Sequence, residues 1–124
     1  MLKFCTQDQA FLPRDLKERF KKVKEMGFYG YEIDGSLLLN NLDEVKAAIK
    51  ETGMPVVSAC GGYRGWIGDF IEERRVNGIE DIEKIIKVCI ENNIPITGSV
   101  FLKTSEEIEK IIEVCRENNI SITG

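Results

Sequence analysis

Short apolar runs alternate with longer amphipathic stretches along this 124-residue sequence. The short runs predict strands, and the amphipathic stretches predict helices. We expect strands at residues 2–6, 28–34, 54–60, 94–97 and 120–123, and helices at 13–27, at 41–53, in a long stretch ending near residue 92, and from about residue 105. Strands that alternate with helices through short connections pair in parallel. The pattern therefore predicts an α/β fold with one parallel sheet of about five strands and four helices.

Residues at the ends of the first two expected helices support this assignment. Pro13 suits a first helical turn, and Gly27 suits the cap that closes the helix. Asn41 can cap the start of the second helix, and Gly53 can end it.

The end of the chain repeats itself. EDIEKIIKVCIENNIPITG (residues 80–98) recurs 26 residues later as EEIEKIIEVCRENNISITG (residues 106–124). In the first copy, the apolar face of a helix is formed by Ile82, Ile85, Ile86 and Cys89. TSEE, at residues 104–107, predicts a capping box before the second helix. The paired asparagines at 92–93 and 118–119 are typical of turns, since asparagine tolerates left-handed backbone. We interpret the repeat as a duplicated helix–strand unit that extends the same sheet.

Length and charge restrict the class of protein. A chain of 124 residues predicts a single domain over residues 1–124, and 17 basic against 21 acidic residues give a net charge of -4. The sequence contains no block of basic residues, so we expect no nucleic-acid partner. The sequence contains neither an apolar run of membrane-spanning length nor a signal peptide, so we expect no membrane partner and a cytoplasmic location.

Two residue types restrict the chemistry. The four cysteines show no CxxC spacing, so we expect buried thiols and no metal cluster. The sequence contains no histidine. The commonest general base and the commonest transition-metal ligand are therefore excluded from this chain.

The loop CGGYRGWIGDF (residues 60–70) follows the third expected strand. Arg64 can bind a carboxylate or a phosphate through its fork, and Trp66 can stack on a sugar face. The glycines equally fit a tight turn, with Trp66 covering the end of the sheet. The sequence leaves these two interpretations of the loop open.

Polar residues also follow the first two expected strands. Gln7 and Gln9 can contact hydroxyl groups, although loop polarity explains them equally well. Glu32 and Asp34 lie two residues apart on a strand and so share one of its sides. Glu32 can act as an acid, a base or a hydroxyl acceptor, but an ordinary strand-end carboxylate is the simpler interpretation.

Four motifs carry a resemblance to a known family: KFCTQDQAFLP, GYEIDG, NLDEVKAAIKETGMPVVSACGGYRGWIGDF and EERRVNGIEDI. They resemble the amino-terminal part of the sugar phosphate isomerase/epimerase family of TIM barrels akin to xylose isomerase. The resemblance covers residues 1–92 and implies half of a barrel, because a full barrel takes ~250 residues. It also implies a small sugar or sugar phosphate as the ligand, with Glu32 as a catalytic residue. The substrate contacts that it implies are Gln7, Gln9, Tyr63, Arg64 and Trp66.

The resemblance further implies a divalent metal, Mn or Mg, bound by glutamate, aspartate and histidine on later strands. No position of this sequence matches those ligands, so we assign no metal-binding residue here. Two functions stay open: a metal-dependent sugar isomerase or epimerase, and a non-catalytic structural or binding module. Two folds also stay open. One is an open flavodoxin-like sandwich, and the other is a half-barrel that pairs with a second copy or with a complementary half-barrel.

Overall fold

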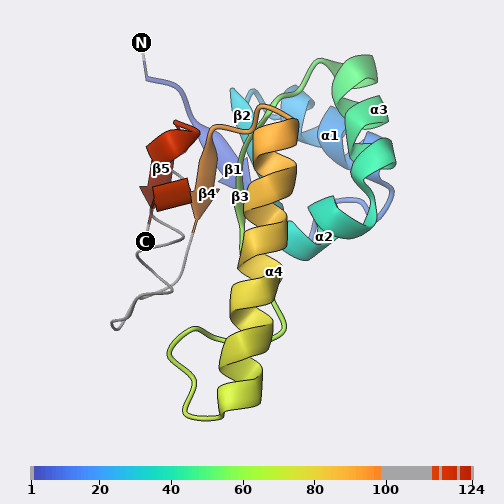
Figure 1. The fold of residues 1–124 in the computed structure, drawn as a ribbon. Coiled ribbons are helices and arrows are strands. Elements are labelled where there is room, and N and C mark those ends of the chain that lie inside the picture. Colours follow the sequence, from blue (N-terminus) through green and yellow to red (C-terminus); the bar gives the residue numbers. More distant parts are fainter. Residues whose placement is uncertain (1, 99–112, 115, 120, 124) are drawn as a thin grey trace.

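The computed structural model describes residues 2–98, 113–114, 116–119 and 121–123 (Figure 1). Strands and helices alternate along most of the chain. In order they are β1 (Cys5–Gln7), α1 (Leu16–Glu25), β2 (Gly30–Asp34), α2 (Gly35–Asn40), α3 (Leu42–Thr52), β3 (Val56–Cys60), α4 (Glu72–Glu91), β4 (Ile96–Gly98) and β5 (Ser121–Thr123).

The five strands form one parallel sheet in the sequential order β1-β2-β3-β4-β5. A flavodoxin-like sandwich has the order 2-1-3-4-5, because its chain reverses direction across the sheet. A TIM barrel adds each strand beside the previous one. The described sheet is therefore part of a barrel, and the open sandwich is the wrong alternative.

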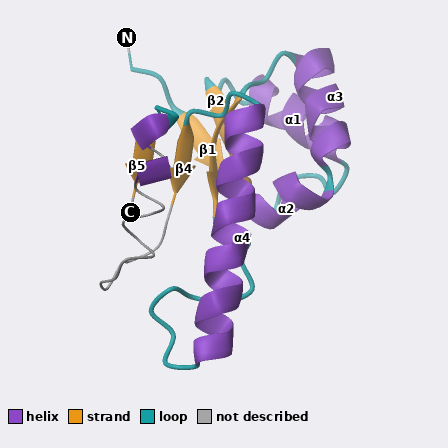
Figure 2. Cartoon of the chain, in the orientation of Figure 1, coloured by secondary structure: helices purple, strands orange, loops and turns teal. Residues whose placement is uncertain are grey.

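Helices cover one face of this sheet (Figure 2). On that face, Tyr31 and Ile33 of β2 and Ala59 of β3 are fully buried. The ring of Phe20 in α1 meets the ring of Tyr31 edge to face, with 5.0 Å between centroids. Leu16, Phe20 and Val23 follow the helical spacing that the sequence shows, and all three are buried. The core thus lies between the helices and this face of the sheet.

The opposite face of the sheet carries polar side chains. The pairing of β2 with β3 shifts between Tyr31 and Glu32, because β3 has an extra residue there. Tyr31 pairs with Val56, whereas Glu32 pairs with Ser58. The irregularity brings Ser58 to the same face as Glu32, where the two side chains are hydrogen-bonded. A β-bulge of this kind redirects side chains within a sheet.

Three expectations about the helices need correction. Helix α1 begins at Leu16 rather than near Pro13, because Asp15 caps it by accepting a hydrogen bond from the Glu18 amide. Asn41 stands at the start of α3, but its side chain donates to the Leu37 carbonyl and does not cap the helix. The short helix α2 was not expected from the sequence.

Two features of the repeated segments fall within the described residues. Asn93 and Asn119 both have left-handed backbone, with φ of 56° and 55°. Strands β4 and β5 pair in parallel as neighbours. The expected capping box at residues 104–107 and most of the second helix lie outside the described residues.

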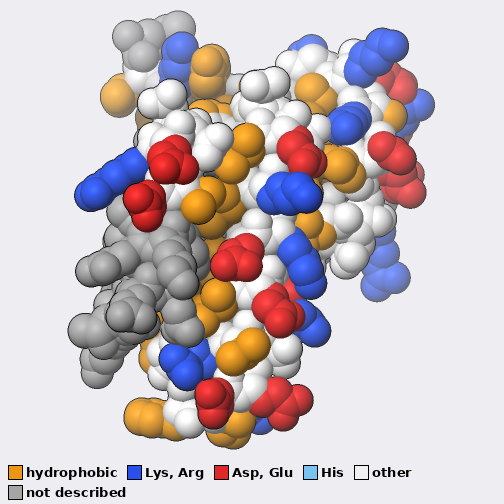
Figure 3. All heavy atoms as spheres, viewed as in Figure 1, with side chains coloured by type: hydrophobic (Ala, Val, Ile, Leu, Met, Phe, Trp, Pro, Cys, Tyr) orange, Lys and Arg blue, Asp and Glu red, His pale blue; other side chains and the backbone are white. Residues whose placement is uncertain are grey.

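The helix-covered surface mixes both signs of charge. Figure 3 shows acidic and basic side chains interspersed over it, with apolar groups between them. None of the described helices combines the length and the apolar character that a membrane-spanning helix requires.

Candidate functional site

A row of three polar side chains crosses the open face of the sheet. Gln7 of β1 pairs with Glu32 of β2, and Glu32 pairs with Ser58 of β3. The Gln7 Nε2 group donates to Glu32 Oε1 at 2.6 Å, and Ser58 Oγ donates to Glu32 Oε2 at 2.6 Å. Each oxygen of the carboxylate therefore accepts one hydrogen bond from a neighbouring strand. We call Gln7, Glu32 and Ser58 the polar row.

The polar row borders a cavity of about 180 Å³ at the carboxyl ends of the strands. Its lining comprises Gln7, Asp8, Glu32, Ile33, Asp34 and Cys60. Burial and the nearby carboxylates of Glu32 and Asp34 raise the pKa of the Cys60 thiol. The cavity is thus lined by acidic and neutral groups, and its thiol is held in the protonated form at neutral pH.

Asp8, which lines this cavity, accepts hydrogen bonds from several elements. Its Oδ1 accepts hydrogen bonds from the Arg19 guanidinium at 2.9 Å and from the Tyr31 hydroxyl, and its Oδ2 accepts one from the Asp34 amide at 2.7 Å. The Asp8 and Arg19 side chains are 22% and 15% exposed. Burial, followed by the hydrogen bond to Asp8 and its charge, raises the pKa of Tyr31 well above its usual value. Asp8 therefore links the loop after β1 to α1 and to both ends of β2.

Asp34 has a structural role at the start of α2. Its Oδ1 accepts hydrogen bonds from the Leu37 amide at 3.0 Å and from Ser36 Oγ at 2.7 Å. This is the cap geometry in which a carboxylate satisfies a free amide of the first helical turn. The carboxylate of Asp34 is thus held at the start of α2.

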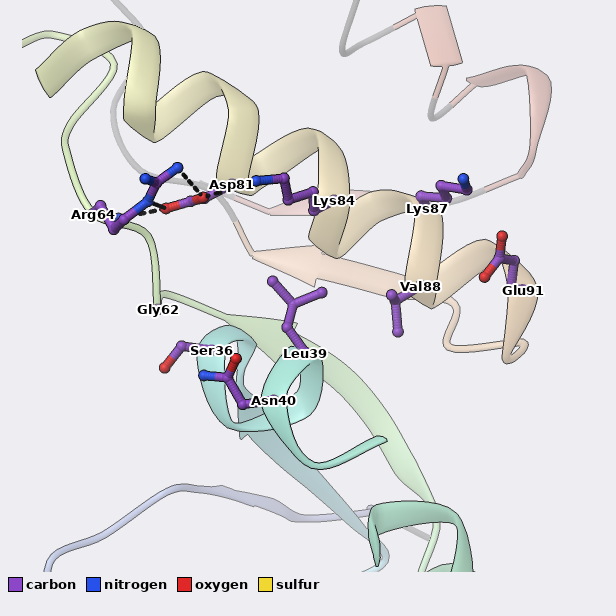
Figure 4. Close-up of a pocket in the computed structure, with 10 residues that line it drawn as sticks. All are labelled: Ser36, Leu39, Asn40, Gly62, Arg64, Asp81, Lys84, Lys87, Val88 and Glu91. Carbon is purple, nitrogen blue, oxygen red and sulfur yellow. Dashed lines mark hydrogen bonds and ion pairs between the residues drawn. The ribbon is translucent and has the colours of Figure 1, made fainter. Parts of the chain in front are cut away.

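The glycine-rich loop after β3 is fastened to α4 by Arg64 (Figure 4). Arg64 Nε and Nη2 donate to the two oxygens of Asp81, at 2.8 and 2.9 Å, and the Arg64 amide also donates to Asp81 at 2.8 Å. These bonds lower the pKa of Asp81. Bidentate arginine–carboxylate pairs hold a fixed geometry. We call this contact the Arg64–Asp81 clasp.

The clasp borders a second, larger cleft between α2 and α4. This cleft has a volume of about 600 Å³ and is distinct from the cavity of the polar row. Figure 4 shows Leu39 and Val88 facing one another across it, with Ser36 and Asn40 along its α2 side. Lys84 and Lys87 line the α4 side. Arg64 therefore lies in a groove of the helical layer, apart from Gln7 and Glu32.

Glycines allow the same loop to approach its neighbours closely. Gly62 has a φ of +76°, and a Cβ there would lie 2.1 Å from the Ser36 amide nitrogen. A Cβ on Gly65 would lie 1.7 Å from the Arg74 carbonyl oxygen. Only glycine fits such contacts between backbones. Trp66, which is 41% exposed, packs beside Gly68, and Tyr63 packs against the core.

The structure joins some of the residues that the sequence singled out and separates others. It brings Gln7 and Glu32 into hydrogen-bonding contact, whereas Gln9 lies on a neighbouring hollow beside Asp8 and Arg19. Sequence reasoning missed Ser58 and the hydrogen bonds that Asp8 accepts. The only signal for Ser58 is a polar residue inside an apolar strand, a position that needs a hydrogen-bond partner.

The residues do not fit the metal that the resemblance implies. The sequence contains no histidine, and within the described ranges no three Asp, Glu, Cys or His side chains are placed to hold a metal ion. We therefore assign no metal ligand and derive no step through a metal.

The sequence pattern of one protein family, described as xylose isomerase-like TIM barrel, matches residues 20–122. The chain belongs to this family. The match covers most of the chain, including the part beyond residue 92 in which sequence reasoning found no family motif.

The matches from Escherichia coli are named as sugar epimerases. The 3-dehydro-D-guloside 4-epimerase of strain K12 is 63% identical over 90 residues, which are 73% of this chain and 34% of the relative. The crystal structure of the apo form of 3-keto-D-glucoside 4-epimerase superposes with a TM-score of 0.86 and 41% identity, over 98% of this chain and 55% of that chain. This chain therefore spans only about a third to a half of their lengths.

A more distant structure has the same fold. D-psicose 3-epimerase, solved in the presence of D-fructose, superposes with a TM-score of 0.71 at 13% identity, over 98% of this chain and 51% of that chain. At this identity the likeness concerns the fold alone.

Proposed function

We propose that this chain forms the substrate-lining half of a sugar epimerase barrel. The polar row carries the proposal, because it places an oriented carboxylate on the open face of a barrel-type sheet. TIM-barrel enzymes hold their active sites at the carboxyl ends of the strands, and the cavity beside the polar row lies there.

The named substrates of the two E. coli relatives support the choice of reaction. In both names the keto group is on carbon 3 and the inverted centre is carbon 4. A hydrogen on the carbon next to a carbonyl can be removed as a proton, and its return to the opposite face inverts that carbon. Reactions of this class use positioned acids and bases. Glu32 is our candidate for the carboxylate that meets the reacting sugar.

The other residues implied by the resemblance stay in the proposal. Gln7 contributes through its bond to Glu32, and Gln9, Tyr63 and Trp66 contribute from the loops after β1 and β3. Arg64 contributes by holding its loop against α4, since its fork is engaged by Asp81.

Five strands do not close an eight-stranded barrel. We propose that a second copy of this chain, or a complementary half-barrel, covers the open face of the described sheet. Light scattering on a size-exclusion column measures the mass in solution. A dimer supports pairing between copies, and a monomer in the absence of any partner contradicts it.

A non-catalytic sugar-binding or structural module is the second candidate function. Among the described residues, no group of three His, Cys, Asp or Glu side chains is placed to hold a metal ion, and this favours the module. The two candidates differ in one measurable property, namely whether the chain exchanges the hydrogen next to the keto group of a bound sugar.

Proton NMR in D2O tests the proposed function with methyl 3-keto-β-D-glucopyranoside, with and without added Mn²⁺ or Mg²⁺. Loss of the carbon-4 proton signal, abolished by Glu32→Gln, supports an epimerase. Glu51→Gln is the matched control, since Glu51 pairs with Lys17 on the exposed surface of α1 and α3. Sugar binding without exchange supports the module. Failure to bind the sugar contradicts both the epimerase and the sugar-binding module, and leaves the structural module.

A further inference from the structure

The chemistry of the cavity beside the polar row restricts the kind of sugar that can rest there. A carboxylate has about four acceptor positions, two on each oxygen. In Glu32 one position on each oxygen is taken, by Gln7 Nε2 and by Ser58 Oγ. Each oxygen keeps acceptor capacity for one more donor. Two neighbouring hydroxyl groups on a sugar ring provide two such donors.

The two internal hydrogen bonds also fix the carboxylate in place. They reach it from opposite sides, one from β1 and one from β3, and each is 2.6 Å long. A carboxylate held in this way does not reorient when a ligand arrives, so less conformational entropy is lost on binding. A pre-oriented acceptor of this kind suits recognition of a fixed hydroxyl pair.

The charge of the cavity excludes another class of ligand. Its lining includes the carboxylates of Asp8, Glu32 and Asp34 and no lysine or arginine, as far as the described residues go. Arg19 forms an ion pair with Asp8, which leaves Glu32 and Asp34 as negative groups beside the cavity. Burial, and then the charges of Glu32 and Asp34, raise the pKa of the Cys60 thiol. A phosphate or carboxylate on the ligand meets like charge there.

Arg64, in the loop after β3, does not neutralise this negative charge. Arg64 follows the same strand as Cys60, but its fork is occupied by Asp81, and it lies in the cleft between α2 and α4. Positive charge is therefore directed away from the cavity of the polar row.

We propose that Glu32 binds two adjacent hydroxyls of an uncharged sugar, and that the surface formed by β1–β3 discriminates against sugar phosphates and sugar acids. This inference rests on the proposed function, because it concerns the same cavity. It assigns Ser58 and Gln7 as positioning residues for Glu32, and it selects neutral glycosides from the sugars and sugar phosphates that the sequence left open.

Titrations of the ¹⁵N-labelled 124-residue chain, followed by heteronuclear NMR, test the inference. The probes are methyl β-D-glucopyranoside, glucose 6-phosphate and glucuronate at equal ionic strength. We expect the neutral glycoside to shift the amides of residues 7, 32, 58 and 60, with the charged sugars binding at least about tenfold more weakly. Amides of the cleft between α2 and α4, such as that of Lys84, report binding elsewhere.

Variants separate recognition by Glu32 from a general effect on the fold. Glu32→Gln should weaken binding of the neutral glycoside about tenfold and remove most of the discrimination against glucose 6-phosphate. Ser58→Ala should weaken binding of the glycoside by a smaller factor and keep the discrimination against glucose 6-phosphate. Glu51→Gln, which removes one distant charge, should change neither, and the unperturbed amides of each spectrum report whether the variant is folded.

The outcomes distinguish the inference from the proposed function. If glucose 6-phosphate shifts the same amides with equal or higher affinity, the inference is overturned while a sugar site remains. If none of the probes shifts these amides, the proposed function fails and the inference fails with it. If Glu32→Gln leaves the preference unchanged, the carboxylate is not its source, and the inference is again overturned.

Discussion

Replacing Asp8 with alanine should destabilise this protein far more than removing an exposed carboxylate. The Asp8 carboxylate accepts three hydrogen bonds, from Arg19, Tyr31 and the Asp34 amide. Its removal leaves a guanidinium that is only 15% exposed without this partner, together with a buried hydroxyl and an amide. Breaking a buried ion pair costs ~3–5 kcal/mol, and each unsatisfied buried group costs ~1–3 kcal/mol.

Two features of the structure reduce the stability loss expected for Asp8→Ala. The Asp8 side chain is 22% exposed, so water can enter the space that it leaves. Arg19 keeps its hydrogen bond to the Pro13 carbonyl, at 2.7 Å. We therefore expect Asp8→Ala to lower the free energy of unfolding by about 3 kcal/mol, a large share of the ~5–15 kcal/mol of a typical domain.

Urea unfolding at pH 7, followed by circular dichroism at 222 nm, measures this free energy. Asp43→Ala is the control, because Asp43 is exposed in the first turn of α3, where its charge is worth ~0.3–1 kcal/mol. A double-mutant cycle with Tyr31→Phe should give a coupling of ~1 kcal/mol, since the two residues share a hydrogen bond. A loss for Asp8→Ala within 1 kcal/mol of the control would refute the reasoning.

Three further predictions concern the loop after β3 and the end of that strand. Because the pKa of Asp81 is lowered by Arg64, the stabilisation from their clasp is fully present above the unfolded value near 3.8 and is lost as pH falls through the folded value. Urea unfolding should therefore show Asp81→Asn less stable than the parent at pH 7, with the difference shrinking at pH 3; an unchanged difference contradicts the clasp. Gly62→Ala should lower the free energy of unfolding by at least ~3 kcal/mol, because a Cβ there meets the backbone of α2, whereas Gly27→Ala, also at positive φ but in open space, should cost only ~1–2 kcal/mol. Equal losses for the two glycines would show that backbone conformation alone decides them. Burial and the two carboxylates of β2 raise the pKa of Cys60, so iodoacetamide should modify Cys60 slowly at pH 7 and faster as pH rises, as peptide mapping by mass spectrometry reports; modification that is fast and independent of pH contradicts a protonated thiol.

Much of the fold could be predicted from local pattern. The helical spacing of Leu16, Phe20, Val23 and Met26 within residues 13–27 predicts α1. The first three are buried in it, whereas Met26 at its end is 45% exposed. Asparagine at positions 93 and 119 predicted left-handed backbone at both turns of the repeat, and both have it. These features depend on residues within one or two turns of each other, where covalent geometry and side-chain spacing act directly.

The local pattern predicted the structure less well where a helix directly follows a strand. Helix α2 is only six residues long, and its sequence, GSLLLN, follows a strand without a break. Its cap, Asp34, lies two residues after Glu32, so the sequence places both carboxylates on one side of a strand. In the structure, the hydrogen bonds from the Leu37 amide and from Ser36 hold the Asp34 carboxylate at α2.

The sequence by itself determined the strands and most of the helices, the parallel sheet and the residues at the strand ends. Only the tertiary structure decided which of those residues meet. Ser58 reaches Glu32 across 26 positions, and Arg64 reaches Asp81 across 17. The first contact depends on the irregular pairing of β2 with β3, and shifting a strand by one residue turns its side chains to the other face. Register and helix packing are properties of the whole sheet and its core, so the spacing of residues along the chain cannot reveal them.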